Sequence, residues 1–168
     1  MALLEPEIAI RPLQPADLSV AANIIAICAD GDFAHQFALL ERRLARGRAD
    51  DALIVAELDG RIAGVGRVSY FEPAEDAPAN AAPSGYYLLG VNVDPRYRRR
   101  GVGKALTAAR IAWISKRATV AWYFTRVSNL ESIRLHESFG FRRNTSDFWF
   151  PNVDFGTSGG VLFSLALR

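Results

Sequence analysis

Apolar and polar residues follow a strand period in some segments of this sequence and a helix period in others. The alternation in Glu7–Leu13 predicts an edge strand, and the apolar run Tyr86–Val93 predicts a central strand buried on both faces. Seven segments predict strands: residues 7–13, 52–58, 61–71, 86–93, 119–127, 141–150 and 160–167. Four segments with apolar residues three or four positions apart predict helices: residues 17–28, 32–46, 102–117 and 128–140. This order predicts a mixed α/β domain with helices packed on a central sheet.

Capping and turn residues set the expected element ends. Asp17 and Asp32 are expected to cap the first two helices, and Gly47 to end the second. Asp59-Gly60 predicts a tight hairpin, and Ser128–Glu131 matches a capping box. The third helix is expected to face inward through Val102, Leu106, Ala109 and Trp113, and the last strand through Val161, Phe163, Leu165 and Leu167. Residues 73–85, with three prolines, predict a solvated connection, with a lid or substrate loop as the alternative.

Composition excludes several classes of protein. At 168 residues, half of them apolar and 23% charged, the chain is expected to fold as a single domain over residues 1–168. Its one cysteine, Cys28, cannot form an internal disulfide and is expected to be a small buried hydrophobe. No apolar run approaches the ~18 residues of a membrane span, and the first residues lack a secretory pattern. These features predict a cytoplasmic protein that does not enter a membrane.

The charge is concentrated at one place, although the net charge is only +2. Two glycines, Gly101 and Gly103, stand where the third helix begins, so backbone amides there can approach an anion. A P-loop is excluded because Arg98 stands where it needs glycine, and a dinucleotide fingerprint is excluded by Leu106. Five cations complete an anion trap suited to a pyrophosphate: Arg96, Arg98, Arg99, Arg100 and Lys104.

The segment Val91–Lys104, read as V-N-V-D-P-x-Y followed by Arg-x-x-Gly-x-Gly, resembles the acyl-CoA signature of the GNAT N-acetyltransferase superfamily. The resemblance implies a single domain whose mostly antiparallel, seven-stranded sheet contains a splayed parallel pair and is flanked by four helices. It implies acetyl-CoA as co-substrate and no metal. Val91 and Val93 would pair with the pantetheine arm, and the Val93 N–H would stabilise the oxyanion. The loop would begin at Arg98, and Arg100 would add positive charge to it. The backbone amides that would hold the pyrophosphate are those of Arg99, Gly101, Val102, Gly103 and Lys104.

Residues 127–141 resemble the family's helix of type N-x-x-S-x-x-L-Y-x-x-x-G-F. Asn129, Ser132 and His136 share one helical face. By the resemblance, Asn129 and Ser132 would contact the cofactor, although Asn129 could also cap the helix. Many members have at this position a tyrosine that donates a proton to the thiolate. This chain has His136 there instead, as the resemblance to phosphinothricin-type members implies. Imidazole titrates near neutrality and could do this; a purely structural histidine is the alternative.

The sequence offers several candidates for the general base and for the acceptor pocket. Tyr86–Val93 contains no carboxylate, so Glu72 is a candidate base, with a merely solvated glutamate as the alternative. A water ordered by Tyr86, Tyr87 or Asn92, or His136 itself, could also take the proton. The acceptor pocket is expected from the first two helices, the 73–85 loop and residues 141–160. In the 29–35 connection Asp30, Asp32 and Phe33 suit a cationic ligand, although Asp32 is equally a helix cap.

These features predict an acetyl-CoA-dependent N-acetyltransferase acting on a primary amine of a small molecule or peptide. The alternative is a non-catalytic GNAT-fold module that binds acyl-CoA as a sensor or partner. A third hypothesis, nucleic-acid binding through the arginine cluster, is disfavoured by the small net charge. A homodimer formed along the final strands is a further expectation.

Overall fold

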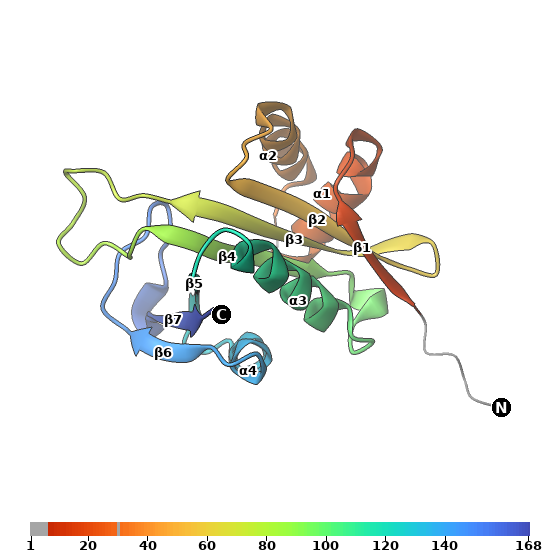
Figure 1. Ribbon diagram of the computed structural model, residues 1–168. Helices are drawn as coiled ribbons and strands as arrows, with labels where there is room; N and C mark the ends of the chain where they lie inside the picture. The colour runs from red at the N-terminus through yellow and green to blue at the C-terminus, as the bar shows by residue number, and fades with distance from the viewer. Residues whose placement is uncertain (1–6, 30) are drawn as a thin grey trace. The chain divides into compact units, whose positions relative to one another are not determined.

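The computed structural model describes residues 7–29 and 31–168 (Figure 1). Its strands are β1 (Ile8–Pro12), β2 (Asp51–Leu58), β3 (Arg61–Phe71), β4 (Gly85–Val93), β5 (Val120–Arg126), β6 (Arg142–Thr145) and β7 (Gly160–Ala166). Its helices are α1 (Leu18–Cys28), α2 (Phe33–Arg46), α3 (Val102–Ser115) and α4 (Leu130–Ser138). The strands form one sheet in the order β1-β2-β3-β4-β5-β7-β6, in which β4 and β5 are parallel. This confirms the predicted α/β class and element order.

The chain forms two compact units. The first comprises residues up to Arg67 together with Gly90–Arg110, and the second comprises Val68–Leu89 and Ile111–Arg168. Strands β3 and β4 and helix α3 contribute residues to both units. A single domain over residues 1–168 stays a prediction.

In the first unit, β1 pairs antiparallel with β2, and the predicted hairpin connects β2 to β3. β1 pairs with β2 from Ile8↔Leu58 to Pro12↔Ile54, and β1 is the edge strand, as predicted. Asp59 and Gly60 both have positive φ, 53° and 73°, which is the backbone that a two-residue primed turn needs. The hairpin prediction is confirmed.

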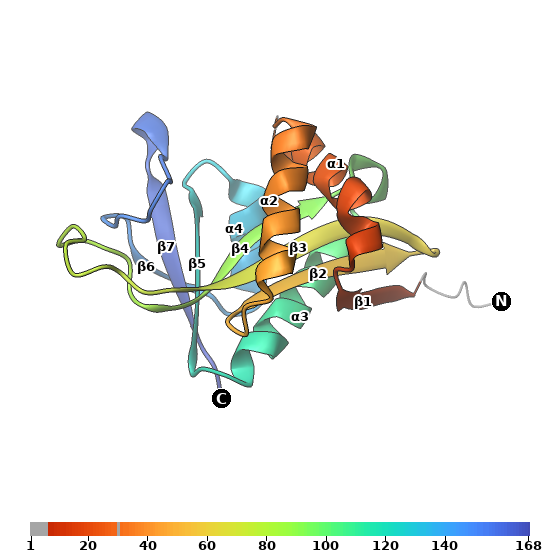
Figure 2. The same ribbon diagram turned by 90° about the horizontal axis from the view of Figure 1, so that it is seen from above.

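Helices cover both faces of the first unit's strands. Figures 1 and 2 show α1 and α2 side by side on one face and α3 on the other. Because strand side chains alternate, Val55 of β2 joins the α1–α2 core, while Ala56 packs with Val102 and Leu106 of α3. A Cβ on Gly64 would lie 2.9 Å from Leu106 Cδ1 and 3.0 Å from the Asn92 carbonyl oxygen. Glycine at this position of β3 therefore lets α3 approach closely.

The helix ends agree with the sequence at α2 and only in part at α1. Asp32 accepts a hydrogen bond from the Ala34 N–H, and Gly47 ends α2 with φ of 52°. Asp17 stands at the N-cap position of α1, as predicted, but its side chain makes no capping hydrogen bond to that helix. It closes the 3-10 turn Pro15–Asp17 instead and accepts from the Gln14 N–H. Its carboxylate also binds Arg11, at 2.6 Å and 3.0 Å, because Arg11 lies within reach and offers a charged double donor.

The third helix buries a different set of residues from the predicted one. Val102 and Leu106 are buried as expected, but Ala109 and Trp113 are only half-buried. Arg110, which the apolar pattern did not select, is 1% exposed. The reason is that the guanidinium donates hydrogen bonds to carbonyl groups inside the unit.

In the second unit, β7 lies between β5 and β6. It pairs with β5 from Val120↔Ala166 to Arg126↔Gly160, and with β6 through a register shift after Arg143. Both faces of β7 are covered, because Leu162 packs with Ala82 and Tyr87 while Phe163 packs against Tyr123. Leu162 is therefore as buried as Val161 and Phe163, and the one-sided alternation predicted for this strand is wrong.

The strand predicted over residues 141–150 is too long. β6 ends at Thr145, where the side-chain Oγ1 accepts from the Asp147 N–H and turns the chain. The residues that follow carry aromatic side chains into a cluster with β4 and β5: Phe71, Tyr87, Trp122, Phe124, Phe148 and Phe150.

The 73–85 connection is a loop, as predicted, but it is not simply solvated. Ala82 is fully buried, and its N–H donates to the Trp149 carbonyl at 2.8 Å. The Trp149 N–H in turn donates to the Asn80 carbonyl at 2.9 Å. These main-chain bonds fix the end of the loop to the segment after β6.

Candidate functional site

The predicted pyrophosphate loop lies in the first unit, between the end of β4 and α3. Asp94, which is 4% exposed, caps the 3-10 turn Pro95–Tyr97 by accepting from the Arg96 N–H at 2.9 Å. The Arg96 guanidinium binds the same carboxylate at 2.7 Å and thereby lowers the pKa of Asp94. The Asp94 N–H donates to the Ala63 carbonyl of β3. Asp94 therefore fixes the chain where it leaves the strand.

The loop backbone turns through two left-handed residues before the helix begins. Arg99 has φ of 60° and Gly101 has φ of 85°. The Gly101 carbonyl accepts from the Ala105 N–H at 2.9 Å, so α3 starts directly after it. The N–H groups of Val102, Gly103 and Lys104 are thus the first of the helix, where no preceding turn supplies a carbonyl and the dipole is positive. This geometry suits a bound anion.

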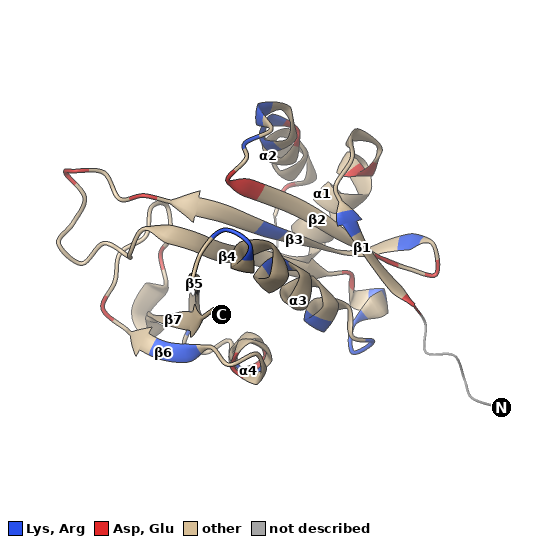
Figure 3. Ribbon diagram, in the orientation of Figure 1, with Lys and Arg blue, Asp and Glu red and all other residues tan. Residues whose placement is uncertain are grey.

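Blue segments mark the cations of the loop and of the start of α3 in Figure 3. Their side chains differ in what they contact. Arg96 is paired with Asp94, and Arg100 lies 3.5 Å from Asp59. Arg99 and Lys104 are exposed and form no ion pair among the residues that the structure describes. Arg98 is also exposed and forms no ion pair in the described part of the chain, so the unpaired positive charge here comes from Arg98, Arg99, Lys104 and the helix start.

Arg98 reaches back to β4 instead of pointing along the loop. Its Nε donates to the Val93 carbonyl at 3.3 Å, and its Nη2 lies 3.6 Å from Cys28 Sγ. Cys28 Sγ donates to the same carbonyl at 3.3 Å. Cys28 is half-buried, so it is not the fully buried hydrophobe expected, and it joins the end of α1 to the end of β4.

Strand β4 changes character along its length. Tyr86 and Tyr87 pair in parallel with Ala121 and Trp122 of β5. Gly90 then adopts φ of 69° and is exposed, and Val91 and Val93 beyond it are half-buried. A left-handed glycine inside a strand marks a bulge or a close backbone approach.

The second group of predicted residues lies on α4, in the second unit. The helix begins at Leu130 with Asn129 as its cap, whose Oδ1 accepts from the Ser132 N–H at 3.3 Å. The capping box predicted from Ser128 is therefore wrong by one residue. Asn129 takes the capping position because its amide oxygen accepts from the N–H of the third helical residue, Ser132.

His136 is held in one orientation by its surroundings in this unit. It is 1% exposed, and its Nδ1 lies 2.8 Å from the Ser132 carbonyl. A carbonyl only accepts, so Nδ1 donates, and Nε2 is the nitrogen that gains or loses the titrating proton. The ring stacks on Tyr123 of β5 at 3.5 Å between centroids and 3° between planes.

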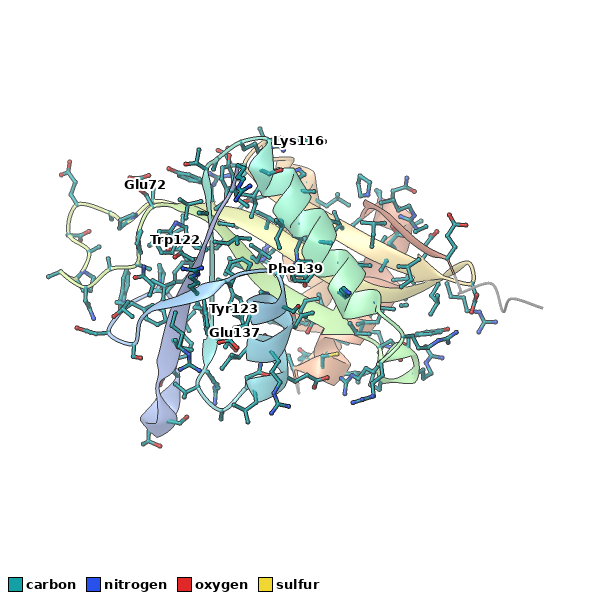
Figure 4. All side chains as sticks on the ribbon, turned by 60° about the horizontal axis from the view of Figure 1, so that its bottom comes forward. Glu72, Lys116, Trp122, Tyr123, Glu137 and Phe139 are labelled. Carbon is teal, nitrogen blue, oxygen red and sulfur yellow. The ribbon has the colours of Figure 1, made fainter. Side chains whose placement is uncertain are left out.

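Tyr123 also fixes α4 through its hydroxyl, which shares a hydrogen bond with Ser132 Oγ. Figure 4 labels Tyr123 on β5 and Glu137 and Phe139 at the end of α4. Sequence reasoning missed Tyr123, although its place in a mostly apolar strand was the available signal.

Glu72 lies in the second unit, directly after β3 (Figure 4). It is exposed, and its Oε2 accepts from the Tyr70 hydroxyl at 3.0 Å. Tyr70 packs edge-on against Tyr86, with ring centroids 5.1 Å apart. Tyr87 is less suited to hold a water, because it is fully buried and its hydroxyl donates to the Pro83 carbonyl at 2.6 Å. Burial also raises the pKa of Tyr87 above its usual value.

Of the residues expected in the acceptor pocket, several have structural roles. Asp32 caps α2, Phe148 joins the aromatic cluster, and Phe33 is 43% exposed at the start of α2. Asp30 lies outside the described residues.

The sequence profile of the Acetyltransferase (GNAT) family matches residues 22–141, more than half of the chain. The chain belongs to this family. GNAT membership agrees with the motif in residues 91–104 and with the strand order of the sheet.

Two curated relatives match parts of this GNAT chain. A mycothiol acetyltransferase of Acidothermus cellulolyticus is 31% identical over 134 residues, which cover 72% of this chain and 38% of the relative. A ribosomal protein bS18-alanine N-acetyltransferase of Escherichia coli K12 is 35% identical over 86 residues, which cover 48% of this chain and 55% of the relative. The chain thus spans less than two thirds of the length of either relative.

Solved structures with the same fold cover nearly the whole chain. yncA of Salmonella typhimurium, solved with its cofactor acetyl-CoA, has a TM-score of 0.70 at 20% identity and covers 96% of this chain and 94% of its own. Ard1 of Thermoplasma volcanium has a TM-score of 0.71 at 22% identity and covers 96% and 98%. At these identities the likeness concerns the fold.

The described part of the chain contains neither a candidate metal site nor a candidate membrane-spanning helix. Within residues 7–29 and 31–168, no group of three or more His, Cys, Asp or Glu side chains could hold a metal ion. No helix in that part of the GNAT chain has the length and apolar character needed to span a bilayer.

Proposed function

We propose that this GNAT protein transfers an acetyl group from acetyl-CoA to a primary amine of a small molecule or peptide. The observation that carries the proposal is the loop that opens α3, where Gly101 is left-handed and the next three N–H groups begin the helix. Arg99 and Lys104 add exposed positive charge beside these groups. A pyrophosphate is the anion that this arrangement suits.

The residues of the first unit would bind the cofactor. The N–H groups of Val102, Gly103 and Lys104 would hold the pyrophosphate, together with the backbone at Arg99 and Gly101. Arg98 contributes by fixing the end of β4, and Arg100 by its charge, which Asp59 partly offsets. Val91 and Val93 would pair their backbone with the pantetheine arm. In the second unit, Asn129 caps with Oδ1, which leaves its Nδ2 group as a donor, and Ser132 would contribute a hydroxyl contact.

Bound acetyl-CoA supplies a thioester that an amine can attack, releasing the CoA thiol. The Val93 N–H would donate a hydrogen bond to the carbonyl oxygen as negative charge develops there. His136, in place of the tyrosine found in many members, would deliver a proton from Nε2 to the departing sulfur, since its Nδ1 is committed to Ser132. Glu72, or His136 in its neutral form, would accept the proton that the amine loses. One proton is thus taken from nitrogen and one is given to sulfur.

The names of two relatives support the proposed acceptor class. One is named for mycothiol, a small molecule, and the other for an alanine of a ribosomal protein. Because neither is matched over two thirds of its length, the acceptor of this chain is proposed only as an amine of either kind. We also propose a cytoplasmic location, which a single cysteine suits, and a homodimer formed along the outer strand β6.

The test combines ligand-induced stabilisation with thiol release. Acetyl-CoA and CoA at about 1 mM should raise the melting temperature by several degrees, whereas ATP should not raise it. The reason is that a ligand at 100 times its Kd stabilises the folded protein by about 2.7 kcal/mol. Free thiol should then appear from acetyl-CoA only when an amine is added, from a panel of small amines, amino acids and peptides with free N-termini.

The outcomes separate the two functional hypotheses. A melting shift without amine-dependent thiol release across the panel would favour the non-catalytic acyl-CoA-binding module. No shift with either CoA compound would contradict the assignment of the α3 loop.

A further inference from the structure

Arg110 is a charged side chain in the interior of the first unit. It lies on α3, is 1% exposed and is the largest of the fully buried side chains. Its guanidinium donates within its own helix, from Nε to the Leu106 carbonyl at 3.3 Å and from Nη2 to Thr107 Oγ1 at 3.1 Å. Burying a guanidinium is strongly unfavourable unless its donors are satisfied, so these contacts hold it in place.

The third nitrogen of Arg110 leaves the helix and reaches the sheet. Nη1 donates to the Gly90 carbonyl of β4 at 3.3 Å and to the Arg67 carbonyl of β3 at 3.5 Å. The side chain passes over Gly66, where a Cβ would lie 3.2 Å from Arg110 Cδ. One guanidinium therefore joins α3 to two adjacent strands at the level of Gly90.

Gly90 is a left-handed residue inside β4. It has φ of 69°, and space is not the constraint there, because an added Cβ would meet only the Asn92 side chain at 3.7 Å. The backbone geometry itself is what must be maintained. Val91 and Val93 follow directly, so the orientation of the Gly90 peptide sets the direction of their N–H and C=O groups.

We propose that Arg110 is a positioning residue for acetyl-CoA. By holding the Gly90 carbonyl, it fixes the course of residues 91–93, along which the pantetheine arm pairs. The inference rests on the proposed function. The planar fork of arginine is required because it donates to its own helix and to the strands at once, whereas lysine offers a single point charge.

The test compares two ligands that share the nucleotide but differ in the arm. Acetyl-CoA extends along residues 91–93, whereas 3′-phosphoadenosine 5′-diphosphate carries the pyrophosphate and ends there. Arg110→Met should weaken acetyl-CoA binding about tenfold or more, since small displacements of a positioning group have large effects, and should leave the nucleotide affinity within about twofold. Arg110→Lys should not restore acetyl-CoA affinity. Isothermal titration measures both ligands.

Leu40→Ala is the matched control for general destabilisation. Leu40 is a core residue of the same unit, at 1% exposure, and its truncation should leave the ratio of the two affinities unchanged. Gly90→Ala provides a second test that does not depend on the folding of the Arg110 variant. It strains the left-handed backbone without a steric clash and should reproduce the selective loss of acetyl-CoA affinity.

Several results would overturn the inference. Equal weakening of both ligands in Arg110→Met would make Arg110 merely structural, and unchanged acetyl-CoA affinity in either that variant or Gly90→Ala would remove the proposed coupling. If the unmodified protein binds the nucleotide and acetyl-CoA with no difference in affinity, the arm is not held along residues 91–93. Failure of the unmodified protein to bind either ligand would instead contradict the proposed function.

Discussion

At the scale of single residues, the local environment decides what a side chain can do. His136 is an example. The sequence predicts its place on the helix, but it does not show which ring nitrogen carries the hydrogen. The Ser132 carbonyl fixes Nδ1 as the donor, and the Tyr123 ring fixes the plane of the imidazole. Nε2 is therefore the only ring atom at which His136 can exchange a proton while keeping this geometry.

Replacing His136 with phenylalanine keeps a ring to stack on Tyr123 and removes the titrating nitrogen. If His136 moves a proton in the reaction, His136→Phe should lower kcat by about 100-fold or more and leave the acetyl-CoA Kd nearly unchanged. Steady-state kinetics and titration measure the two quantities. Glu137→Gln, at the exposed neighbouring position, should change neither. A parallel loss of affinity and turnover in His136→Phe would make the residue structural.

At the scale of elements, the start of α3 shows how a loop and a helix together make a site. The sequence contains two glycines and a run of cations here. In the structure the two glycines have different roles, and so do the cations. Gly101 is needed for its left-handed backbone, whereas Gly103 is already helical. Arg96 is paired with Asp94, so the charge that could attract an anion comes from the helix start, Arg98, Arg99 and Lys104.

Gly101→Val should abolish measurable acetyl-CoA binding, because a branched residue cannot adopt φ of 85° without strain and the amides that follow would be displaced. Calorimetry with acetyl-CoA measures the loss. Gly47→Ala is the control, since Gly47 is also left-handed, at 52°, with no atom near its Cβ position, but it ends α2. Retained affinity in Gly101→Val would contradict the loop assignment, as would an equal loss in Gly47→Ala.

At the scale of the whole molecule, folding stability depends on long-range pairs that no local pattern shows. Arg11 of β1 binds Asp17 in the following turn and Glu57 of β2, 46 residues away. These contacts lower the pKa of Asp17, with the Arg11 hydrogen bonds as the main cause. A lowered folded-state pKa means that the stabilisation is present above the unfolded pKa of about 3.9 and is lost as the pH falls through the folded value.

Asp17→Asn should therefore reduce the free energy of unfolding by about 1–3 kcal/mol at pH 7, and the difference from the unmodified protein should shrink as the pH is lowered below about 4. Urea titrations at several pH values measure this. Asp76→Asn, in the exposed 73–85 loop, should show little effect at any pH. A difference between Asp17→Asn and the unmodified protein that stays constant down to low pH would exclude the ion pair as its source.

Much of the fold follows from the sequence alone, because periodicity and turn chemistry are local. The strand and helix order, the Asp59-Gly60 turn, the Gly47 stop and the clustering of glycines and cations in residues 98–104 all depend on residues close together in the chain. These features would hold for any tertiary arrangement that buries the same apolar faces.

Only the tertiary structure decided which polar groups meet. It made Asp17, expected only as a helix cap, a partner of Arg11, and it buried Arg110 against the Gly90 carbonyl. The physical reason is the same in each case. A charged or polar side chain is directed by partners far away in sequence, and a single chain pattern carries no record of which partners the fold brings within hydrogen-bond distance.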